Sequence, residues 1–157
     1  MKNLIILIGN IGTGKTTFIK TQNLIEKGYV VIARDRLRYN IGGGNYIFNT
    51  KYEAIIWKTE LFMFENFLKL GTNIVIDEVG VSKSLRKRYI PLAKKYKYQI
   101  VAIEMPKLTK EMAVNRRMQN PHQQNDRKLW EEIWEKFDAQ YESPEYSEGF
   151  EHILKLV

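Results

Sequence analysis

Four short, mainly apolar runs divide the chain, and each of them ends at a glycine or a polar cluster. They are residues 4–8, 29–33, 73–76 and 98–104. Apolar runs of this length, bounded by turn or polar residues, are typical of strands buried on both faces of a parallel sheet. The pattern therefore predicts four buried strands.

The stretches between these runs carry the start and stop signals of helices. Thr50 followed by Glu53 is a capping-box pattern that opens a long helix. Gly28 stands where a glycine after a helix end is expected, and Pro91 predicts a kink. The predicted helices are residues 15–27, 50–71, 82–96, 109–118 and 126–139, with approximate ends.

Strands and helices alternate along the whole chain, with no linker, repeat or low-complexity tract. This alternation predicts a parallel sheet that is covered by helices on both faces. Ligands of such sheets bind at the carboxyl ends of the strands. Polar clusters follow three of the predicted strands, at residues 9–16, 34–35 and 77–78. We therefore expect one α/β domain over residues 1–157, with its site at that edge of the sheet.

The composition limits the classes of partner that the protein is expected to bind, but it does not identify one. The 25 Lys and Arg residues exceed the 18 Asp and Glu residues, and the formal net charge is +7, which favours anionic partners such as nucleotides or nucleic acid. The chain has no cysteine, which excludes disulfides and thiolate metal sites. The apolar run at residues 4–8 is too short for a secretion signal or a membrane span. We expect a cytoplasmic protein (in the host cytoplasm if phage-encoded) with no membrane partner and an undetermined oligomeric state.

The residues after the first run form a P-loop, the loop that binds the phosphates of a nucleoside triphosphate. The predicted cofactor-binding residues are Gly9, Asn10, Ile11, Gly12, Thr13, Gly14, Lys15, Thr16 and Thr17. The motif lies between a strand and a helix, as it must, and its spacing does not match the dinucleotide-binding fingerprint. The backbone N–H groups would surround the phosphates, Lys15 would reach the β- and γ-phosphates, and Thr16 would bind Mg²⁺. The fold expected from this loop is the P-loop NTPase type, a three-layer sandwich with a central parallel sheet flanked by helices.

Two acidic residues end the third predicted strand. Asp77 stands where the acidic residue of a Walker B site stands, and there it would hold Mg²⁺ together with Thr16. The alternative is an ordinary strand-terminal acid. Glu78 would activate water if the protein were a hydrolytic ATPase, so two reaction classes stay open at this point.

The cluster Arg34-Asp35-x-x-Arg38 follows the second predicted strand. A carboxylate there faces the place of a phosphoryl acceptor, opposite the γ-phosphate. Asp35 could accept the proton of an attacking hydroxyl, and Arg38 could hold a phosphate of the acceptor. The alternative is a strand-end aspartate that caps the next turn, beside two surface arginines.

The P-loop and Arg34-Asp35-x-x-Arg38 together resemble the kinase module of phage-type polynucleotide 5′-hydroxyl kinases. The similarity continues through Asp77, an arginine-containing helix at Arg116 and the segment 148–150, and so spans essentially the whole chain.

This resemblance implies the roles of several residues. Asp35 would be the general base for the 5′-hydroxyl, and Arg34 and Arg38 would bind the acceptor beside it. Lys15 and Arg116 would complete the catalytic set, with ATP as the phosphate donor and Mg²⁺ as its metal.

Two features depart from the family pattern. No Asp-x-Asp phosphatase motif is present, so no 3′-phosphatase activity is expected. The family's lid often reads Arg, three residues, Arg-Pro, whereas here Asn120 replaces the second arginine. We expect a helical lid at about residues 109–128, with Arg116 as its main phosphate ligand and Arg117 or Arg127 in place of the missing arginine.

Two further patterns allow a structural and a functional interpretation. Trp130, Trp134 and Phe137 share one helix face, which favours core packing over base stacking. The helix at residues 82–96 is very basic, and it could either follow a nucleic-acid backbone or present a solvated face.

The leading hypothesis is an ATP- and Mg²⁺-dependent kinase that phosphorylates 5′-hydroxyl ends of DNA or RNA. The nearest alternative is a kinase of the same fold that acts on a nucleoside, a nucleotide or another small metabolite. Two hypotheses from different classes are a P-loop ATPase or nucleotide switch that uses Glu78, and a catalytically silent nucleic-acid-binding module.

Overall fold

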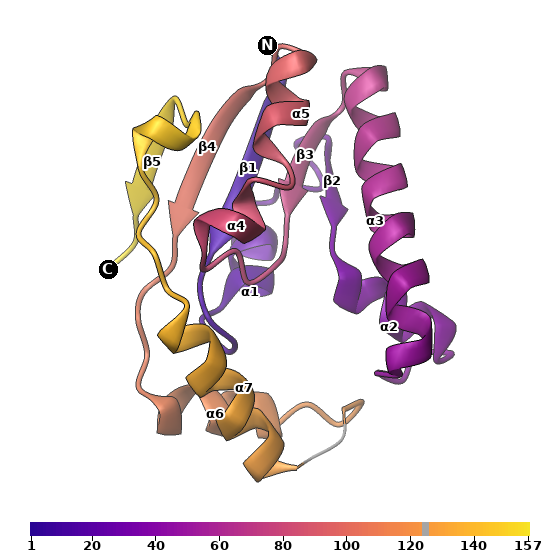
Figure 1. Ribbon diagram of the computed structural model, residues 1–157, viewed down its shortest axis with the longest axis vertical. Helices are drawn as coiled ribbons and strands as arrows, with labels where there is room; N and C mark the ends of the chain where they lie inside the picture. The colour runs from indigo at the N-terminus through magenta and orange to yellow at the C-terminus, as the bar shows by residue number, and fades with distance from the viewer. Residues whose placement is uncertain (124–125) are drawn as a thin grey trace.

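A computed structural model describes residues 1–123 and 126–157, and its centre is a five-stranded parallel sheet. The strands are β1 (Asn3–Ile8), β2 (Tyr29–Ile32), β3 (Asn73–Ile76), β4 (Gln99–Glu104) and β5 (His152–Lys155). Their order across the sheet is β2-β3-β1-β4-β5, and every neighbouring pair is parallel (Figure 1). The three predicted ligand-binding clusters therefore follow adjacent strands at one edge.

The four predicted strands are confirmed, and a fifth one was missed. The residues of β5 are mostly exposed, with only Ile153 partly buried. This edge strand lacks the continuous apolar run that identifies strands buried on both faces. It pairs with β4 through its backbone, a contact that the sequence pattern does not reveal.

The first helices differ from prediction. Helix α1 (Lys15–Thr21) ends well before residue 27, and residues 22–28 form turns in which Asn23 has a positive φ of 51°. The turn directs Leu24 into the core beside Ile19, so packing ends the helix early. A further helix, α2 (Arg34–Ile41), was not predicted and begins directly after β2.

The long helix α3 (Thr50–Leu70) is confirmed, but its cap differs. Asn49 is the N-cap, and its side-chain oxygen accepts from the N–H of Lys51. Glu53 binds Arg38 of α2 instead of closing a capping box. Gly71 ends the helix in a left-handed conformation, as its position predicts.

The predicted helix at residues 82–96 is broken into α4 (Lys83–Arg86) and α5 (Ile90–Lys95). Pro91 lies in the first turn of α5, where its missing N–H costs nothing, so a new helix begins there instead of a kink. Ser82 caps α4 by accepting from the N–H of Leu85.

The basic residues of this region do not form one solvated face. The Arg86 side chain is fully buried and binds Glu148 of the 3₁₀ helix η1 (Tyr146–Glu148), and Arg88 binds Glu60 of α3. Because these two arginines face inward, neither a nucleic-acid contact nor a solvated face describes them.

Two helices at the base of the molecule, α6 (Lys110–Met118) and α7 (Arg127–Ala139), match prediction, with Thr109 and Asp126 as their caps. Trp130 is buried in a cluster with Ile11 and Val114, and Trp134 and Phe137 pack against it, which confirms core packing for this face. The predicted lid includes residues 124–125, which lie outside the described residues.

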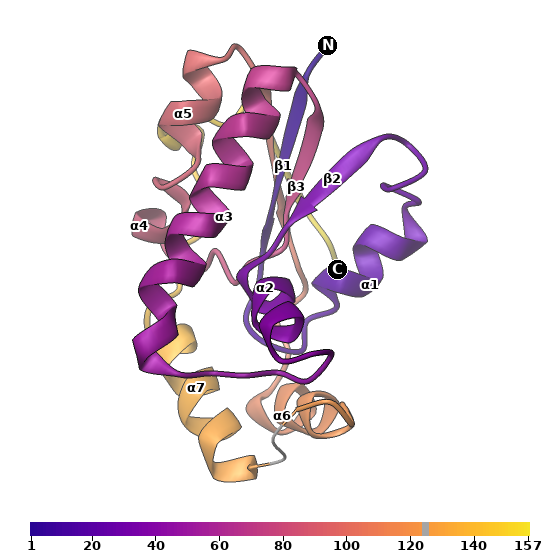
Figure 2. The ribbon, with the colours of Figure 1, turned by 90° about the vertical axis from the view of Figure 1, so that its right-hand side faces the viewer.

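The sheet is the middle of three layers (Figures 1 and 2). One face packs on α3 and α5, where Ile6 of β1 joins Phe64 and Ala93. The opposite face packs on α1, where Leu7 meets Ile19. Successive strand residues therefore serve different layers, and the predicted three-layer α/β fold is confirmed.

Within the described residues, no helix has the length and apolar character needed to cross a membrane.

Phe64 gives a test of this packing. Its side chain is fully buried and makes an edge-to-face contact with Tyr89, with 5.2 Å between the ring centroids. We expect Phe64→Ala to lower the free energy of unfolding by about 3–5 kcal/mol in urea titrations, because it leaves a cavity. The matched control is Phe62→Ala on the same helix, where the residue is 68% exposed, and its effect should stay within about 0.5 kcal/mol. Equal effects of the two variants would contradict the layer assignment.

Candidate active site

The P-loop connects β1 to α1 and folds around the Lys15 side chain. Gly12 and Gly14 have φ values of 72° and 90°, a conformation that favours glycine. Lys15 Nζ donates to the carbonyl oxygens of Gly9 at 2.8 Å and Asn10 at 2.9 Å. Burial lowers the pKa of Lys15 to about 8, although the carboxylate of Asp77 acts in the opposite direction. The loop thus holds a cation at the start of α1.

The tip of the P-loop packs against α6 and α7. Asn10 Nδ2 donates to the Trp134 carbonyl at 2.9 Å, and Ile11 lies in the cluster with Val114. At Gly12 an added Cβ would come within 2.7 Å of the Ala113 carbonyl oxygen. This glycine is therefore required by a close approach of α6 as well as by its φ angle.

Thr16 and Asp77 meet at the start of α1. The Thr16 hydroxyl donates to Asp77 Oδ2 at 2.9 Å, so the two predicted metal ligands are neighbours. Hydroxyl and carboxylate oxygens suit Mg²⁺, which binds few protein ligands and takes its others from phosphates and water. The residues fit the metal. Of the other predicted loop residues, Thr13 donates its hydroxyl to the Asn10 carbonyl, and Thr17 is exposed on α1.

Asp35 lies in the first turn of α2 and remains accessible. Its side chain is 42% exposed. Arg38 NH1 donates to Oδ1 at 2.8 Å, and Arg117 NH2 of α6 donates to Oδ2 at 3.4 Å. The carboxylate therefore joins α2 to the lid helices while it faces solvent.

Arg38 is held by a second carboxylate, Glu53, for which the sequence pattern predicted a helix cap. The Nε and NH2 groups of Arg38 donate to the two oxygens of Glu53 at 3.1 and 2.5 Å, while NH1 binds Asp35. This bidentate pairing fixes the guanidinium plane beside Asp35. If Arg38 contacts an acceptor phosphate as predicted, it can do so only through the N–H groups that Glu53 and Asp35 do not occupy.

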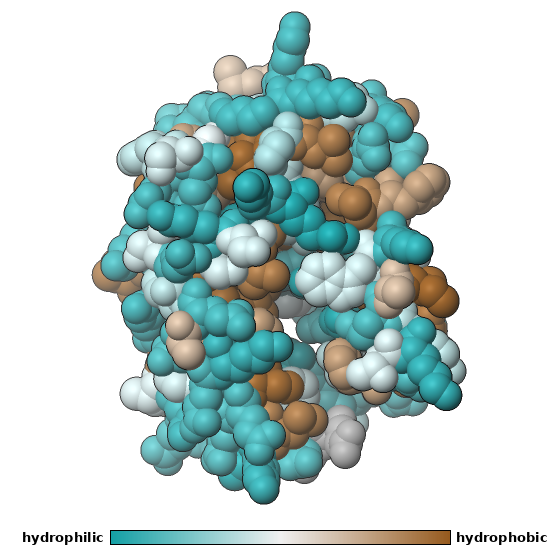
Figure 3. All heavy atoms as spheres, in the orientation of Figure 1, coloured by the Kyte–Doolittle hydropathy of each residue, from teal (hydrophilic) through white to brown (hydrophobic). Residues whose placement is uncertain are grey.

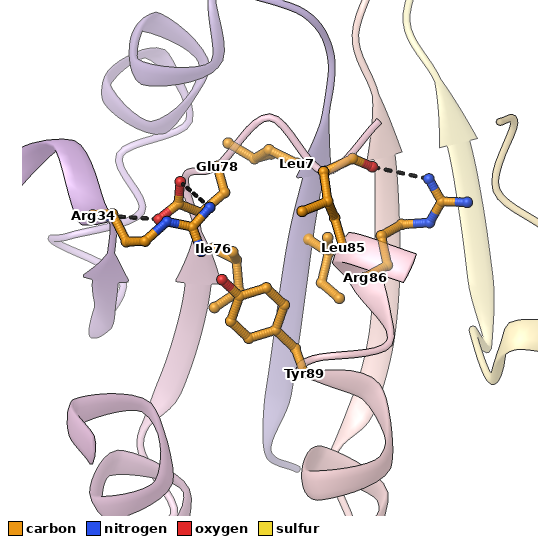
Figure 4. A pocket seen from close by; sticks show the side chains of 9 residues that line it. Leu7, Arg34, Ile76, Glu78, Leu85, Arg86 and Tyr89 are labelled. Atoms are coloured by element: carbon orange, nitrogen blue, oxygen red, sulfur yellow. Dashed lines mark hydrogen bonds and ion pairs between the residues drawn. The ribbon is translucent and has the colours of Figure 1, made fainter. Parts of the chain in front are cut away.

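Arg34 lines a small cavity between the sheet and α4 (Figure 4). Its guanidinium pairs with Glu78 at 3.3 Å and lies 3.6 Å from the centroid of the Trp57 ring. Its predicted role as an acceptor ligand has no support in these contacts. Glu78 is equally enclosed, with 10% of its side chain exposed, and burial raises its pKa to about 7 against the attraction of Arg34.

The three candidate lid arginines differ in what they contact. Arg116 NH1 donates to the Gly12 carbonyl at 3.1 Å, so it lies at the P-loop. Arg117 binds Asp35 and lies 4.5 Å from the Trp130 ring centroid. Arg127 is bound to Asn115 and Glu131, away from both. Of Arg117 and Arg127, it is Arg117 that lies beside Asp35.

A hollow opens on the face shown in Figure 3, between the side formed by α6 and α7 and the side formed by α2 and α3. Beside it, residues 42–49 reach the lid, where Tyr46 N–H donates to the His122 carbonyl at 3.0 Å. Asn120 Nδ2 donates to the Tyr39 hydroxyl at 3.0 Å. These contacts were not foreseen, because they join segments far apart in the sequence.

A family model described as "AAA domain" matches residues 4–144. No curated protein matches the sequence.

Three solved structures resemble the fold. A chain of a Pnkp1/Rnl/Hen1 complex is 27% identical, with a TM-score of 0.61 over 73% of this chain and 38% of that chain. A fungal RNA kinase is 20% identical, with a TM-score of 0.69 over 99% of this chain and 75% of that chain. The APS kinase CysC of Mycobacterium tuberculosis, in complex with AMPPNP and APS, is 14% identical, with a TM-score of 0.60 over 98% of this chain and 88% of that chain. The chain therefore spans only 38% of the first of these proteins, and the last two show likeness of fold alone.

Gly12 provides a test of the P-loop geometry. We expect Gly12→Ala to weaken binding of a non-hydrolysable ATP analogue about tenfold or more, a loss of about 1.4 kcal/mol, because the new methyl group displaces the loop from α6. Calorimetric titration measures this affinity. Gly43→Ala is the matched control, since Gly43 also has a positive φ (60°) but no atom within 4 Å of an added Cβ. A normal affinity in Gly12→Ala would contradict the proposed contact.

Proposed function

The chain belongs to the AAA domain family and has the fold of a P-loop kinase, and we propose that it is an ATP-dependent kinase that phosphorylates 5′-hydroxyl ends of RNA or DNA. The observation that carries this proposal is the accessible carboxylate of Asp35, held beside the P-loop edge of the sheet by arginines from α2 and α6. A hydrolytic nucleotide switch has no need of such an acceptor-side base.

In the proposed reaction, the hydroxyl oxygen of the acceptor forms a bond to the γ-phosphorus of ATP, and the bond from that phosphorus to ADP breaks. Asp35 takes the proton of the attacking hydroxyl. Lys15, together with Arg116 and Arg117, neutralises the negative charge of the transferring group. Thr16 and Asp77 would hold Mg²⁺, which adds positive charge at the phosphates. The remaining task of the protein is to align the hydroxyl with the phosphate.

A polynucleotide acceptor is favoured by three observations. The Pnkp1/Rnl/Hen1 chain is 27% identical, and a second structure of these proteins is described as an RNA repair complex. A fungal RNA kinase has the same fold, and the net charge is +7. A small-molecule kinase is the second candidate, because an APS kinase shares the fold over 98% of this chain.

The ATPase hypothesis relied on Glu78 as a base for water. Both oxygens of Glu78 contact Arg34, one of them at the backbone N–H and the other at the guanidinium. A carboxylate in this position has no free oxygen directed at the P-loop, which favours transfer to an acceptor over hydrolysis.

Asp35→Asn tests the base. We expect phosphoryl transfer to fall about 10²–10⁴-fold while the affinity for ATP is retained, because the amide cannot accept the proton and the P-loop is unaltered. Rates with radiolabelled ATP and calorimetric affinities give the two measurements. Asp138→Asn, at an exposed position on α7, is the control and should transfer at the wild-type rate. Wild-type transfer by Asp35→Asn would refute the assignment of the base.

The acceptor class is tested by supplying 5′-hydroxyl RNA, 5′-hydroxyl DNA, nucleosides and APS with labelled ATP. We expect label on the 5′ ends of the oligonucleotides and little release of phosphate without an acceptor. Label on the small molecules alone would establish the second candidate. Acceptor-independent phosphate release that does not depend on Asp35 would establish an ATPase.

A further inference from the structure

Helix α2 carries Asp35 in its first turn but lacks a cap of its own. Its N-cap residue is Ala33, which has no side-chain oxygen to accept from the first backbone N–H groups. An uncapped helix start leaves these donors unsatisfied and is prone to fray. Because Asp35 is the second residue of this helix, its direction depends on how the first turn is held.

The missing cap comes from the neighbouring strand. Glu78, just beyond the end of β3, accepts from the backbone N–H of Arg34 at 2.6 Å through Oε1. Its Oε2 pairs with the guanidinium of the same residue at 3.3 Å (Figure 4). The Glu78 carboxylate thus binds both the backbone N–H and the guanidinium of Arg34. Its negative charge lies at the positive end of the helix dipole.

The partner of Glu78 is itself fixed by a buried ionic and aromatic cluster. The Trp57 ring of α3 contacts two guanidinium groups, with Arg34 3.6 Å and Arg88 4.7 Å from its centroid. Glu60, whose side chain is fully buried, binds Arg88 at 3.1 Å and accepts from the Tyr89 hydroxyl at 2.5 Å. The first residue of α2 is therefore held from α3 and from the α4–α5 segment as well as from β3.

The adjacent residues Asp77 and Glu78 make contacts with different parts of the site. Asp77 accepts from Thr16 at the P-loop, and Glu78 holds the start of α2. We propose that Glu78 is a positioning residue, which fixes the Asp35 carboxylate relative to the phosphate-binding loop by capping α2. The rigid backbone link between the two acids then sets the distance between the donor half and the acceptor half of the site. This inference rests on the proposed function in taking Asp35 as the base.

Two substitutions test it in the full chain with a 5′-hydroxyl oligonucleotide. We expect Glu78→Ala to lower kcat about 10²-fold, since small misplacements of a catalytic group have effects of that size, with the KM for ATP unchanged. Glu78→Gln keeps an oxygen for the Arg34 N–H and should recover part of kcat. Hydrogen exchange of the α2 amides should be faster in Glu78→Ala and intermediate in Glu78→Gln.

Glu148→Ala and Glu148→Gln are the matched controls. Glu148 also has 10% of its side chain exposed and pairs with a buried arginine, Arg86. These controls should lower the melting temperature without changing kcat or α2 exchange. An unchanged kcat in Glu78→Ala, or an equal loss in Glu148→Ala, would overturn the proposal. If the wild type phosphorylates no polynucleotide, the proposed function fails, while unchanged α2 exchange in Glu78→Ala separately refutes the capping role.

Discussion

The parallel pairing of β1, β3 and β2 is the constraint on which the site depends. Ile6 is opposite Ile76, and Ile76 is opposite Ile32, so β2 and β3 end at the same level and β1 continues past them to Ile8. The segments that leave them are the P-loop, the Asp77-Glu78 pair and the start of α2. Residues far apart in the sequence become neighbours because the hydrogen-bonded register of the sheet fixes the relative positions of their strands.

The charged side chains at this edge of the sheet differ in how far they are buried. Glu60, Glu78 and Arg34 are buried and paired, and the desolvation of such groups is costly unless every oxygen and N–H has a partner. Their contacts fix the orientation of α2 and add little net stability. Asp35, by contrast, is 42% exposed, so the carboxylate that we propose as the base is accessible to solvent.

Sequence patterns predicted the features of the fold that depend on residues near one another in the chain. The four buried strands, the P-loop and the helices that became α6 and α7 depend on residues close together in the chain. Glu53 was misassigned because a capping box and an ion pair to Arg38 require the same residue at the same place. The Glu78–Arg34 contact and the place of Arg117 beside Asp35 depend on tertiary pairing, which no local pattern encodes.

The two contacts of Asp35 are unequal, and the difference fits the proposed reaction. Arg38, clamped by Glu53, holds Oδ1 at 2.8 Å, whereas Arg117 reaches Oδ2 at only 3.4 Å. An acceptor hydroxyl needs one carboxylate oxygen, and the longer contact costs less to replace. Displacement of Arg117 would leave its guanidinium on the lid side of the site, next to the group being transferred. In the proposed reaction, acceptor binding therefore releases a cation where negative charge develops, and the tightly held Arg38 keeps the base in place.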